Sequence, residues 1–293
     1  MTEASAASDP VATMFSGMVD TVKRLASGEL QAVAPRDAAT VVLARDGTAG
    51  PEVYLLRRAA SMAFAAGAFV FPGGSVDARD QDLGDDYWVG PPPSFWAKAL
   101  TCSEPLAKSL VCAAVRETFE ESGVLLAGSD ASTIVADTSG DDWEADRLAL
   151  IDRSLSFAAL LQRRGLVLRA DLLRAWAHWI TPEVEPKRFD TRFFVAALPA
   201  GQRTRDVGGE ADRVAWMAPA DAIAGNERGE MMLMPPTIAT LRDVASFRSV
   251  ADLLAAGDER EIDVIFPKLV LDEGDRLRFL LPHDPDYPRE PAG

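Results

Sequence analysis

The stretch that decides the fold is Arg116-Glu117-Thr118-Phe119-Glu120-Glu121-Ser122-Gly123-Val124. It follows an apolar pattern between Leu106 and Val115 that predicts a helix. Gly123 is a favourable residue to end that helix, because glycine readily adopts the left-handed conformation found just past many helical C-termini. The glutamates of this stretch therefore belong to the last turns of a helix.

Glu117, Glu120 and Glu121 are spaced so that their carboxylates share one face of this helix. Like charges at this spacing repel, and the C-terminal end of a helix is the negative end of its dipole. The arrangement therefore suggests that the carboxylates are kept for binding a cation. Hard oxygen donors of this kind favour Mg²⁺ or Mn²⁺ over a soft metal. The alternative is a solvated acidic helix face, which is what most runs of charge are.

A second feature lies upstream, where Phe71-Pro72-Gly73-Gly74 predicts a turn at the end of a strand. Paired glycines there allow the backbone to come close to a ligand or metal. With both features present, the chain resembles the Nudix hydrolases. Their signature is a Gly, five residues, a Glu, seven residues, then Arg-Glu, an apolar residue, any residue, Glu-Glu, any residue, Gly and an apolar residue. Gly74 would open this signature, and the stretch from Arg116 to Val124 would close it.

The chain departs from this signature between its two halves. Asp80 stands six positions after Gly74, where the family has Glu, and 35 residues separate Asp80 from Arg116 where the family has seven. The inserted segment holds several aspartates and Pro91-Pro92-Pro93, so we expect a polar excursion with a rigid corner rather than a core element. Lys108 takes the place of the first motif glutamate when residues are counted back from Arg116. Whether Asp80 is the spatial equivalent of that glutamate is therefore open.

Further segments resemble the coenzyme A and acyl-CoA diphosphatase branch of the family. These segments are Val53–Arg58, Phe69–Asp77, Ile180–Pro182, Pro186–Phe194 and Pro235–Thr237. The resemblance spans about residues 38 to 250. It implies a Mg²⁺- or Mn²⁺-dependent pyrophosphohydrolase that cleaves the diphosphate of a nucleoside diphosphate linked to another group, with CoA or acyl-CoA favoured. One alternative is ADP-ribose, a dinucleotide or a nucleoside triphosphate as the substrate. Another is a catalytically silent domain that serves as a ligand sensor or binding module.

The resemblance also implies roles for individual residues. The candidate metal ligands are Gly74, through its carbonyl, and Glu117, Glu120, Glu121 and Glu210. The candidate catalytic residues are Glu120, Glu210 and Arg116. Arg116 is expected to orient Glu117 by a bidentate pair rather than to touch substrate. Glu210 lies in a loop ahead of a strand and is either a ligand or the general base that deprotonates water.

Candidate cations for the substrate phosphates lie beside the recognisable motifs at Arg57, Arg58, Arg188 and Arg192. Arginine presents a rigid fork of donors that suits phosphate. The alternative for the pair at the end of a strand, Arg57 and Arg58, is an ordinary exposed surface position. The same alternative applies to Arg188 and Arg192.

Composition is consistent with a globular enzyme. The 293 residues are 48% hydrophobic and 26% charged, which is enough to bury a substantial core. A formal net charge of −15 argues against binding nucleic acid, so we expect a small-molecule nucleotide as the partner. Cys102 and Cys112 lack metal-ligand spacing and are expected to be free thiols in a reducing compartment, with Cys112 inside the helix. We find no signal peptide or transmembrane segment and expect a cytoplasmic protein with no membrane partner.

We expect an α/β (α+β) Nudix fold, with a mixed β-sheet sandwiched between helices. Residues 1–35 would form an N-terminal helical arm, whose amphipathic helix over 10–27 packs on the core or on a second subunit, so a homodimer is left open. Residues 36–293 would form the Nudix domain, with insertions at about 80–105 and 128–177 and a helical part from about 235. Asp141–Ala177 is expected to be largely helical and to act as a lid or a pocket wall. Strands are expected at Thr40–Ala44, Val53–Arg57, Phe69–Phe71, Val124–Leu126, Arg192–Leu198 and Arg213–Met217.

Overall fold

The computed structural model describes residues 10–59, 67–205 and 211–288. The α-helices are α1 (Pro10–Ala26), α2 (Pro93–Ala99), α3 (Glu104–Ser122), α4 (Asp141–Ile151), α5 (Phe157–Arg164), α6 (Pro219–Glu227), α7 (Pro235–Val244) and α8 (Val250–Asp258). The short 3₁₀ helices are η1 (Ala78–Asp82), η2 (Asp85–Tyr87) and η3 (Ala170–Leu172). The β-strands are β1 (Arg36–Asp46), β2 (Pro51–Arg58), β3 (Ala68–Val70), β4 (Gly73–Ser75), β5 (Trp88–Val89), β6 (Ala127–Gly128), β7 (Val167–Arg169), β8 (Leu173–Ile180), β9 (Phe189–Ala197), β10 (Ala211–Met217), β11 (Met232–Leu233), β12 (Val264–Ile265), β13 (Lys268–Leu271) and β14 (Leu277–Leu280).

The chain divides into two compact units. The smaller contains Met1–Arg36, Ile180–Asp190 and Val264–Gly293, and the larger contains Asp37–Trp179 and Thr191–Asp263. In the smaller unit, β13 and β14 form an antiparallel hairpin that contacts α1. The domain boundaries expected from the sequence stay a prediction. The glycine turn and the glutamate-rich helix both belong to the larger unit.

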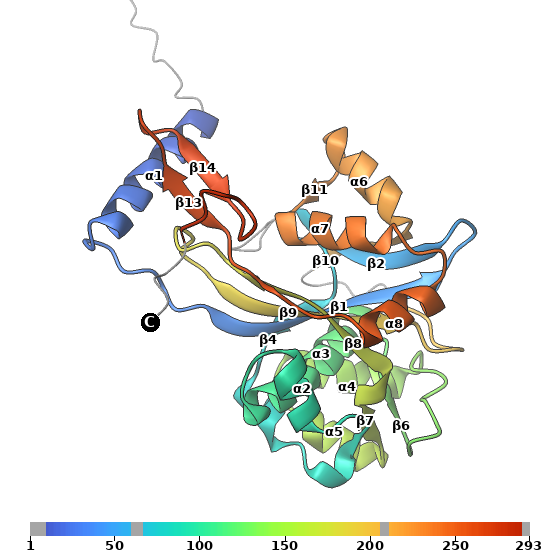
Figure 1. The fold of residues 1–293 in the computed structure, drawn as a ribbon. Helices are drawn as coiled ribbons and strands as arrows, with labels where there is room; N and C mark the ends of the chain where they lie inside the picture. The colour runs from blue at the N-terminus through green and yellow to red at the C-terminus, as the bar shows by residue number, and fades with distance from the viewer. Residues whose placement is uncertain (1–9, 60–66, 206–210, 289–293) are drawn as a thin grey trace, which may run out of the picture. The chain divides into compact units, whose positions relative to one another are not determined.

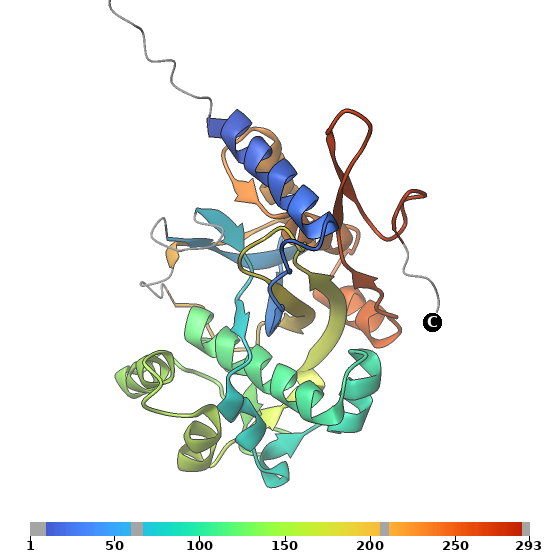
Figure 2. The same ribbon diagram turned by 90° about the vertical axis from the view of Figure 1, so that its left-hand side faces the viewer.

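A mixed sheet between helices organises the larger unit, as expected. Its strands follow the order β11-β3-β2-β1-β9-β8, with β4 paired to β1 and β10 paired to β2. β11 runs parallel to β3, whereas β1 is antiparallel to β2 and to β4. In Figures 1 and 2, α2, α3, α4 and α5 lie on one side of this sheet and α6 and α7 on the other. β4 therefore brings the glycine turn to the side of the sheet on which α3 lies.

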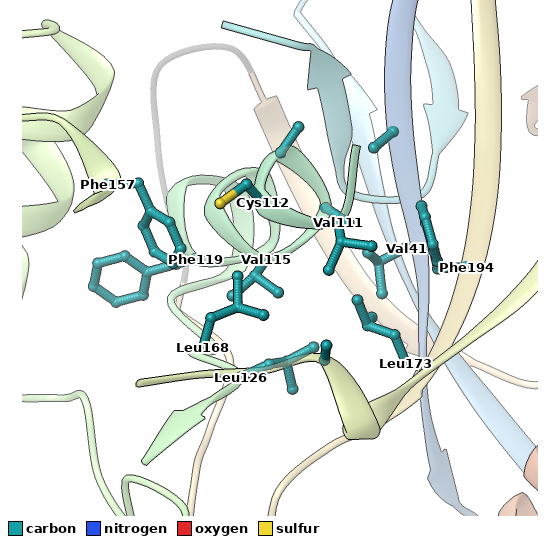
Figure 3. Close-up of a cluster of buried hydrophobic side chains, with 14 of the residues drawn as sticks. Val41, Val111, Cys112, Val115, Phe119, Leu126, Phe157, Leu168, Leu173 and Phe194 are labelled. Carbon is teal, nitrogen blue, oxygen red and sulfur yellow. The ribbon is translucent and has the colours of Figure 1, made fainter. Parts of the chain in front are cut away.

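The main core lies between this sheet and α3. Alternate residues of β1 point to opposite faces of the sheet, so Val41 faces α3 while Val42 faces the other layer. Both are fully buried, which is typical of a strand covered on both faces. Figure 3 shows Val111 of α3 beside Val41 and Phe194 of β9. Cys112 is buried in α3, as the sequence predicted.

Local signals at both ends account for the length of α3. Ser103 caps the N-terminus by accepting a hydrogen bond from the Leu106 amide at 3.4 Å, and Pro105 lies in the first turn, where proline is tolerated. At the other end, Gly123 has φ of 74°, and its amide donates to the Phe119 carbonyl. The predicted helix end at Gly123 is therefore confirmed.

The expectation of a polar excursion in the insertion at about 80–105 is wrong. Leu83, Trp96 and Leu100 of this segment are at most 2% exposed and belong to the main core. Pro93 begins α2, and Trp96 and Leu100 follow at a spacing of four, so both project toward α3. The aspartates of this segment lie in the short 3₁₀ helices and its prolines lead into α2, while Leu83, Trp96 and Leu100 complete the core.

Two expected elements differ from the structure. Val124–Leu126 is buried but is not a strand, because the Gln202 side chain binds both the amide and the carbonyl of Leu125, each at 2.9 Å, in place of a neighbouring strand. Asp141–Ala177 is α-helical only in α4 and α5. It then forms β7 and enters β8, whose nearly continuous buried run has no two-residue alternation to distinguish it from a helix.

Within the described ranges, none of the helices is both long and apolar enough to cross a bilayer.

Candidate active site

Two glycines bring the backbone of β4 close to both β1 and α3. A Cβ on Gly73 would lie 2.5 Å from the Ala39 carbonyl oxygen, and one on Gly74 would lie 2.5 Å from a carboxylate oxygen of Glu117. The Gly73 amide also donates to Oε2 of Glu121 at 2.7 Å. The expected close approach at this turn is therefore present, and its neighbours are the glutamates of α3.

Arg116 is the centre of the hydrogen bonds beside this turn. Its Nε and Nη2 donate to the two oxygens of Asp80 at 2.9 and 3.0 Å. Its Nη1 donates to Glu117 at 2.7 Å and to Glu120 at 3.1 Å, and Nη2 also reaches the Ser75 carbonyl. The expected bidentate pair with Glu117 is thus wrong, because the two-point partner of Arg116 is Asp80. Arg116 still orients Glu117, through one hydrogen bond.

Asp80, and not Lys108, lies at Arg116 despite the inserted segment. Asp80 is 2% exposed and accepts the Asp77 amide at 2.8 Å, which anchors it at the start of η1. Lys108 instead pairs with Asp85, whose side chain is 92% exposed. Of the two positions, it is therefore Asp80 that partners the buried arginine, whose charge would be costly to bury alone. Its equivalence to the first motif glutamate stays open.

Burial and mutual repulsion shift the protonation of this cluster. Burial raises the pKa of Asp80, although Arg116 opposes the rise. Burial likewise raises the pKa of Glu117 to about 7, with Arg116 opposing and Glu120 adding to the rise, and it raises the pKa of Glu120. Burial alone would lower the pKa of Arg116, but its carboxylate partners raise it well above the usual value. The glutamates therefore do not form a solvated acidic face.

The donor set suits a hard divalent cation. Glu117 packs against Gly74, Glu121 accepts from the Gly73 amide, and Glu120 is bound by the same arginine as Glu117, so all three can supply carboxylate oxygens. In this conformation, no three acidic, histidine or cysteine side chains of the described residues already converge on one point. The fit therefore rests on the chemistry of the donors and on the close approach of the Glu117 carboxylate to Gly74. Glu210, the further carboxylate expected from the sequence, lies outside the described residues.

The candidate substrate arginines are spread over both units. Arg57 and Arg58 are half-buried at the end of β2, where Arg58 pairs in register with Ala211. Arg192 is buried in β9, and its Nη1 lies 3.2 Å from Asp37. Arg188 belongs to the smaller unit and donates to the carbonyls of Thr181 and Val33. A role in binding substrate stays a prediction for each of them.

The sequence did not point to Arg147 in α4. Its Nη1 donates to the carbonyl of Glu120 at 2.6 Å, 27 positions away along the chain. Arg147 lies in an inserted helix that carries no motif, so no signal in the sequence could have marked it.

A mixed sheet between helices, with a glycine turn packed on a helix that ends in clustered glutamates, is the arrangement of Nudix hydrolases, which act on diphosphate bonds. This chain belongs to that family, and its residues 91–244 match the family described as the NUDT19 Nudix domain. The resemblance noted in the sequence is therefore confirmed.

The curated relatives match most of the chain. Acyl-coenzyme A diphosphatase NUDT19 of Gallus gallus is 28% identical in an alignment of 308 positions that covers 87% of this chain and 80% of that protein. The protein of the same name from Xenopus laevis is 26% identical, over 84% of this chain and 74% of that protein. Among solved structures, a NUDIX hydrolase from Alicyclobacillus acidocaldarius is similar with a TM-score of 0.66 and 30% identity, covering 79% of this chain and 99% of that one.

Proposed function

We propose that this Nudix hydrolase cleaves the diphosphate of CoA or acyl-CoA with the help of Mg²⁺ or Mn²⁺, releasing 3′,5′-ADP and phosphopantetheine or its acylated form. The main support for CoA or acyl-CoA as the substrate is the similarity to relatives named acyl-coenzyme A diphosphatase. This similarity extends over 84–87% of the chain and thus well beyond the signature. The resemblance at Val53–Arg58 and Phe69–Asp77 supports the same branch.

The charge balance of the site supports a divalent cation. Asp80, Glu117 and Glu120 all accept hydrogen bonds from one buried guanidinium, that of Arg116, so in their deprotonated forms these three carboxylates outnumber its single positive charge. Buried charge without a counter-ion is strongly unfavourable. We assign Glu117, Glu120 and Glu121 as the ligands, with the Gly74 carbonyl and Glu210 as the further candidates. When bound, the cation supplies Lewis-acid stabilisation of the charge on the diphosphate oxygens.

The protein's own groups then have separate tasks. Arg116 holds Glu117 and Glu120 in place through Nη1, while Asp80 fixes the guanidinium plane by a two-point contact. Arg116 is thus a positioning residue. The proton of the attacking water needs an acceptor within hydrogen-bond distance, and Glu120 and Glu210 are the candidates.

A panel of nucleotides with and without Mg²⁺ tests the proposal. We expect CoA to be cleaved to 3′,5′-ADP and phosphopantetheine, identified by mass spectrometry, and only with the metal present. Faster cleavage of ADP-ribose, a dinucleotide or a nucleoside triphosphate would refute the CoA assignment and leave the hydrolase assignment intact. Binding of CoA without any product would instead indicate a sensor or binding module.

The 3′-phosphate of CoA gives a sharper test, because ADP-ribose and dephospho-CoA lack it. We expect dephospho-CoA to have a lower kcat/KM than CoA. Either Arg57→Ala or Arg58→Ala should reduce this difference in kcat/KM between the two substrates. A charge-assisted contact of this kind contributes roughly 1.5–3 kcal/mol, or about ten- to a hundredfold in kcat/KM. Arg45→Ala is a matched control, since Arg45 is a half-exposed strand arginine paired with Glu52. If neither substitution changes the ratio of kcat/KM for CoA to kcat/KM for dephospho-CoA, Arg57 and Arg58 do not contact the 3′-phosphate.

A further inference from the structure

The C-terminal end of α3 receives hydrogen bonds from outside the helix. The last carbonyls of a helix lack intrahelical donors. The amide that would normally serve the Glu120 carbonyl is that of Val124, but it donates to the hydroxyl of Ser122 at 3.2 Å. Nη1 of Arg147 takes its place, at 2.6 Å from the Glu120 oxygen. The main chain at a proposed metal ligand is therefore held by a side chain of α4.

Arg147 is itself held rigidly. Its side chain is 5% exposed, and its Nε and Nη2 donate to the two oxygens of Glu144 at 2.9 and 2.7 Å. Glu144 also accepts from Nη1 of Arg205 at 2.8 Å, and the Arg205 amide donates to the Ser122 carbonyl at 2.8 Å. A two-point pair fixes the plane of a guanidinium. The direction of the remaining Arg147 donor, toward Glu120, is thereby fixed as well.

Aromatic packing supports the same contact between α4 and α3. Phe119, next to Glu120, meets Trp143 of α4 edge-on, with ring centroids 6.1 Å apart. The guanidinium of Arg164 covers the Trp143 ring at 4.0 Å. Glu120 thus lies between two arginines, with Arg116 binding its carboxylate and Arg147 its carbonyl.

We propose that Arg147 is a positioning residue of the metal site. By holding the carbonyl of Glu120, it fixes the last turn of α3 and so the direction in which the Glu120 carboxylate is presented to a divalent cation. This inference rests on the proposed function, in which Glu120 is a metal ligand. It gives the inserted segment that contains α4 a part in assembling the site, beyond packing against α3.

The test compares Arg147→Met and Arg147→Lys with the unmodified protein by calorimetric titration of Mn²⁺ and Mg²⁺, without substrate. We expect Arg147→Met to weaken metal binding by about tenfold or more, as is typical for groups that orient metal ligands. With CoA, kcat should fall more than KM rises. Arg147→Lys should restore part of the affinity, because an ammonium can reach one carbonyl but cannot form the two-point pair with Glu144. Amide hydrogen exchange in the last turn of α3, measured without metal, should become faster in Arg147→Met.

A role in stability alone predicts a different result. Arg147→Met would then unfold at lower denaturant concentration but bind Mn²⁺ with unchanged affinity below its transition, which would overturn the inference. Arg163→Met is the matched control, since Arg163 belongs to the same inserted segment, pairs with Asp146 and is half-exposed. An equal loss of metal binding in this control would also overturn the inference.

Two further outcomes separate the inference from the function on which it rests. Failure of the unmodified protein to bind either metal would refute the proposed function itself. Normal metal binding by both Arg147→Met and the unmodified protein would refute only the role of Arg147. Should Arg147→Met fail to fold, Glu144→Gln retains Arg147 while weakening its two-point pair, and its metal affinity decides between the same outcomes.

Discussion

Gly74→Ala should disable the metal site by displacing Glu117. The added methyl carbon would lie 2.5–2.6 Å from Cδ, Oε1 and Oε2 of Glu117. Non-bonded heavy atoms prefer about 3.5 Å or more, so the carboxylate must retreat by about 1 Å. It is held at Oε1 by Arg116 at 2.7 Å, and retreat strains or breaks that hydrogen bond.

The size of the effect follows from this contact. A hydrogen bond to a charged group contributes about 1.5–3 kcal/mol, which is the expected loss in the free energy of unfolding without metal. Loss of Glu117 as a ligand should weaken Mg²⁺ binding by more than about tenfold, corresponding to about 1.4 kcal/mol. Denaturant unfolding with and without Mg²⁺ and calorimetric titration measure the two quantities separately.

Gly84→Ala is the matched control. Gly84 has φ of −66°, and a Cβ there would meet only Tyr87, at an ordinary 3.5 Å. We expect this variant to bind metal and turn over like the unmodified protein. Wild-type Mg²⁺ affinity in Gly74→Ala would refute the assignment of Glu117 beside the glycine turn as a metal ligand.

Three further predictions concern the same cluster. Glu120→Gln keeps the shape of the side chain and removes its charge, so steady-state assays should show loss of most activity with little change in denaturant unfolding; normal turnover would contradict the assignment. Asp80→Ala leaves buried Arg116 without its two-point partner and should lower the free energy of unfolding by about 3 kcal/mol. Lys108→Ala should lower the free energy of unfolding by less than about 1 kcal/mol, because its partner Asp85 is exposed. Burial raises the pKa of Glu117 from 4.5 to about 7 in the folded protein without metal, so the folded state binds this proton more tightly than the unfolded state does. The resulting contribution to the free energy of unfolding is fully present below pH 4.5 and is lost as the pH rises through about 7. Mg²⁺ binds the deprotonated form, so the rise in Tm on adding Mg²⁺ should be larger at about pH 8 than at about pH 6, and an equal rise would contradict the shifted pKa.

Features that depend on neighbours in the chain were predictable from the sequence. The end of α3 at Gly123 follows from the conformational freedom of glycine, and the three glutamates share a face because of helical spacing alone. The close approach at Gly74 follows from the absence of a side chain. These local rules were enough to locate the candidate site on one helix and one turn.

Features that depend on distant packing were not predictable. Asp80 and Lys108 were equivalent candidates by counting, and only the burial of Arg116 distinguishes them. Trp96 follows three consecutive prolines and stands next to Phe95, which is exposed, so its place in the core becomes visible only when α2 packs on α3. Arg147 has no sequence signal, because its contact is with a backbone carbonyl, a group that every residue possesses.

The pairing of Asp80 with Arg116 across 35 residues has a consequence for how this family can vary. The entropy of closing a loop grows only with the logarithm of its length, so extending seven residues to 35 disfavours closure by about 1.4 kcal/mol. Burying a side chain as large as Trp96 stabilises by about 1.5–3 kcal/mol or more, which offsets that amount. An insertion at this point can therefore be nearly neutral for stability when it brings its own core residues. The segment between the two halves of the signature can then change in length and composition while the carboxylates keep their places.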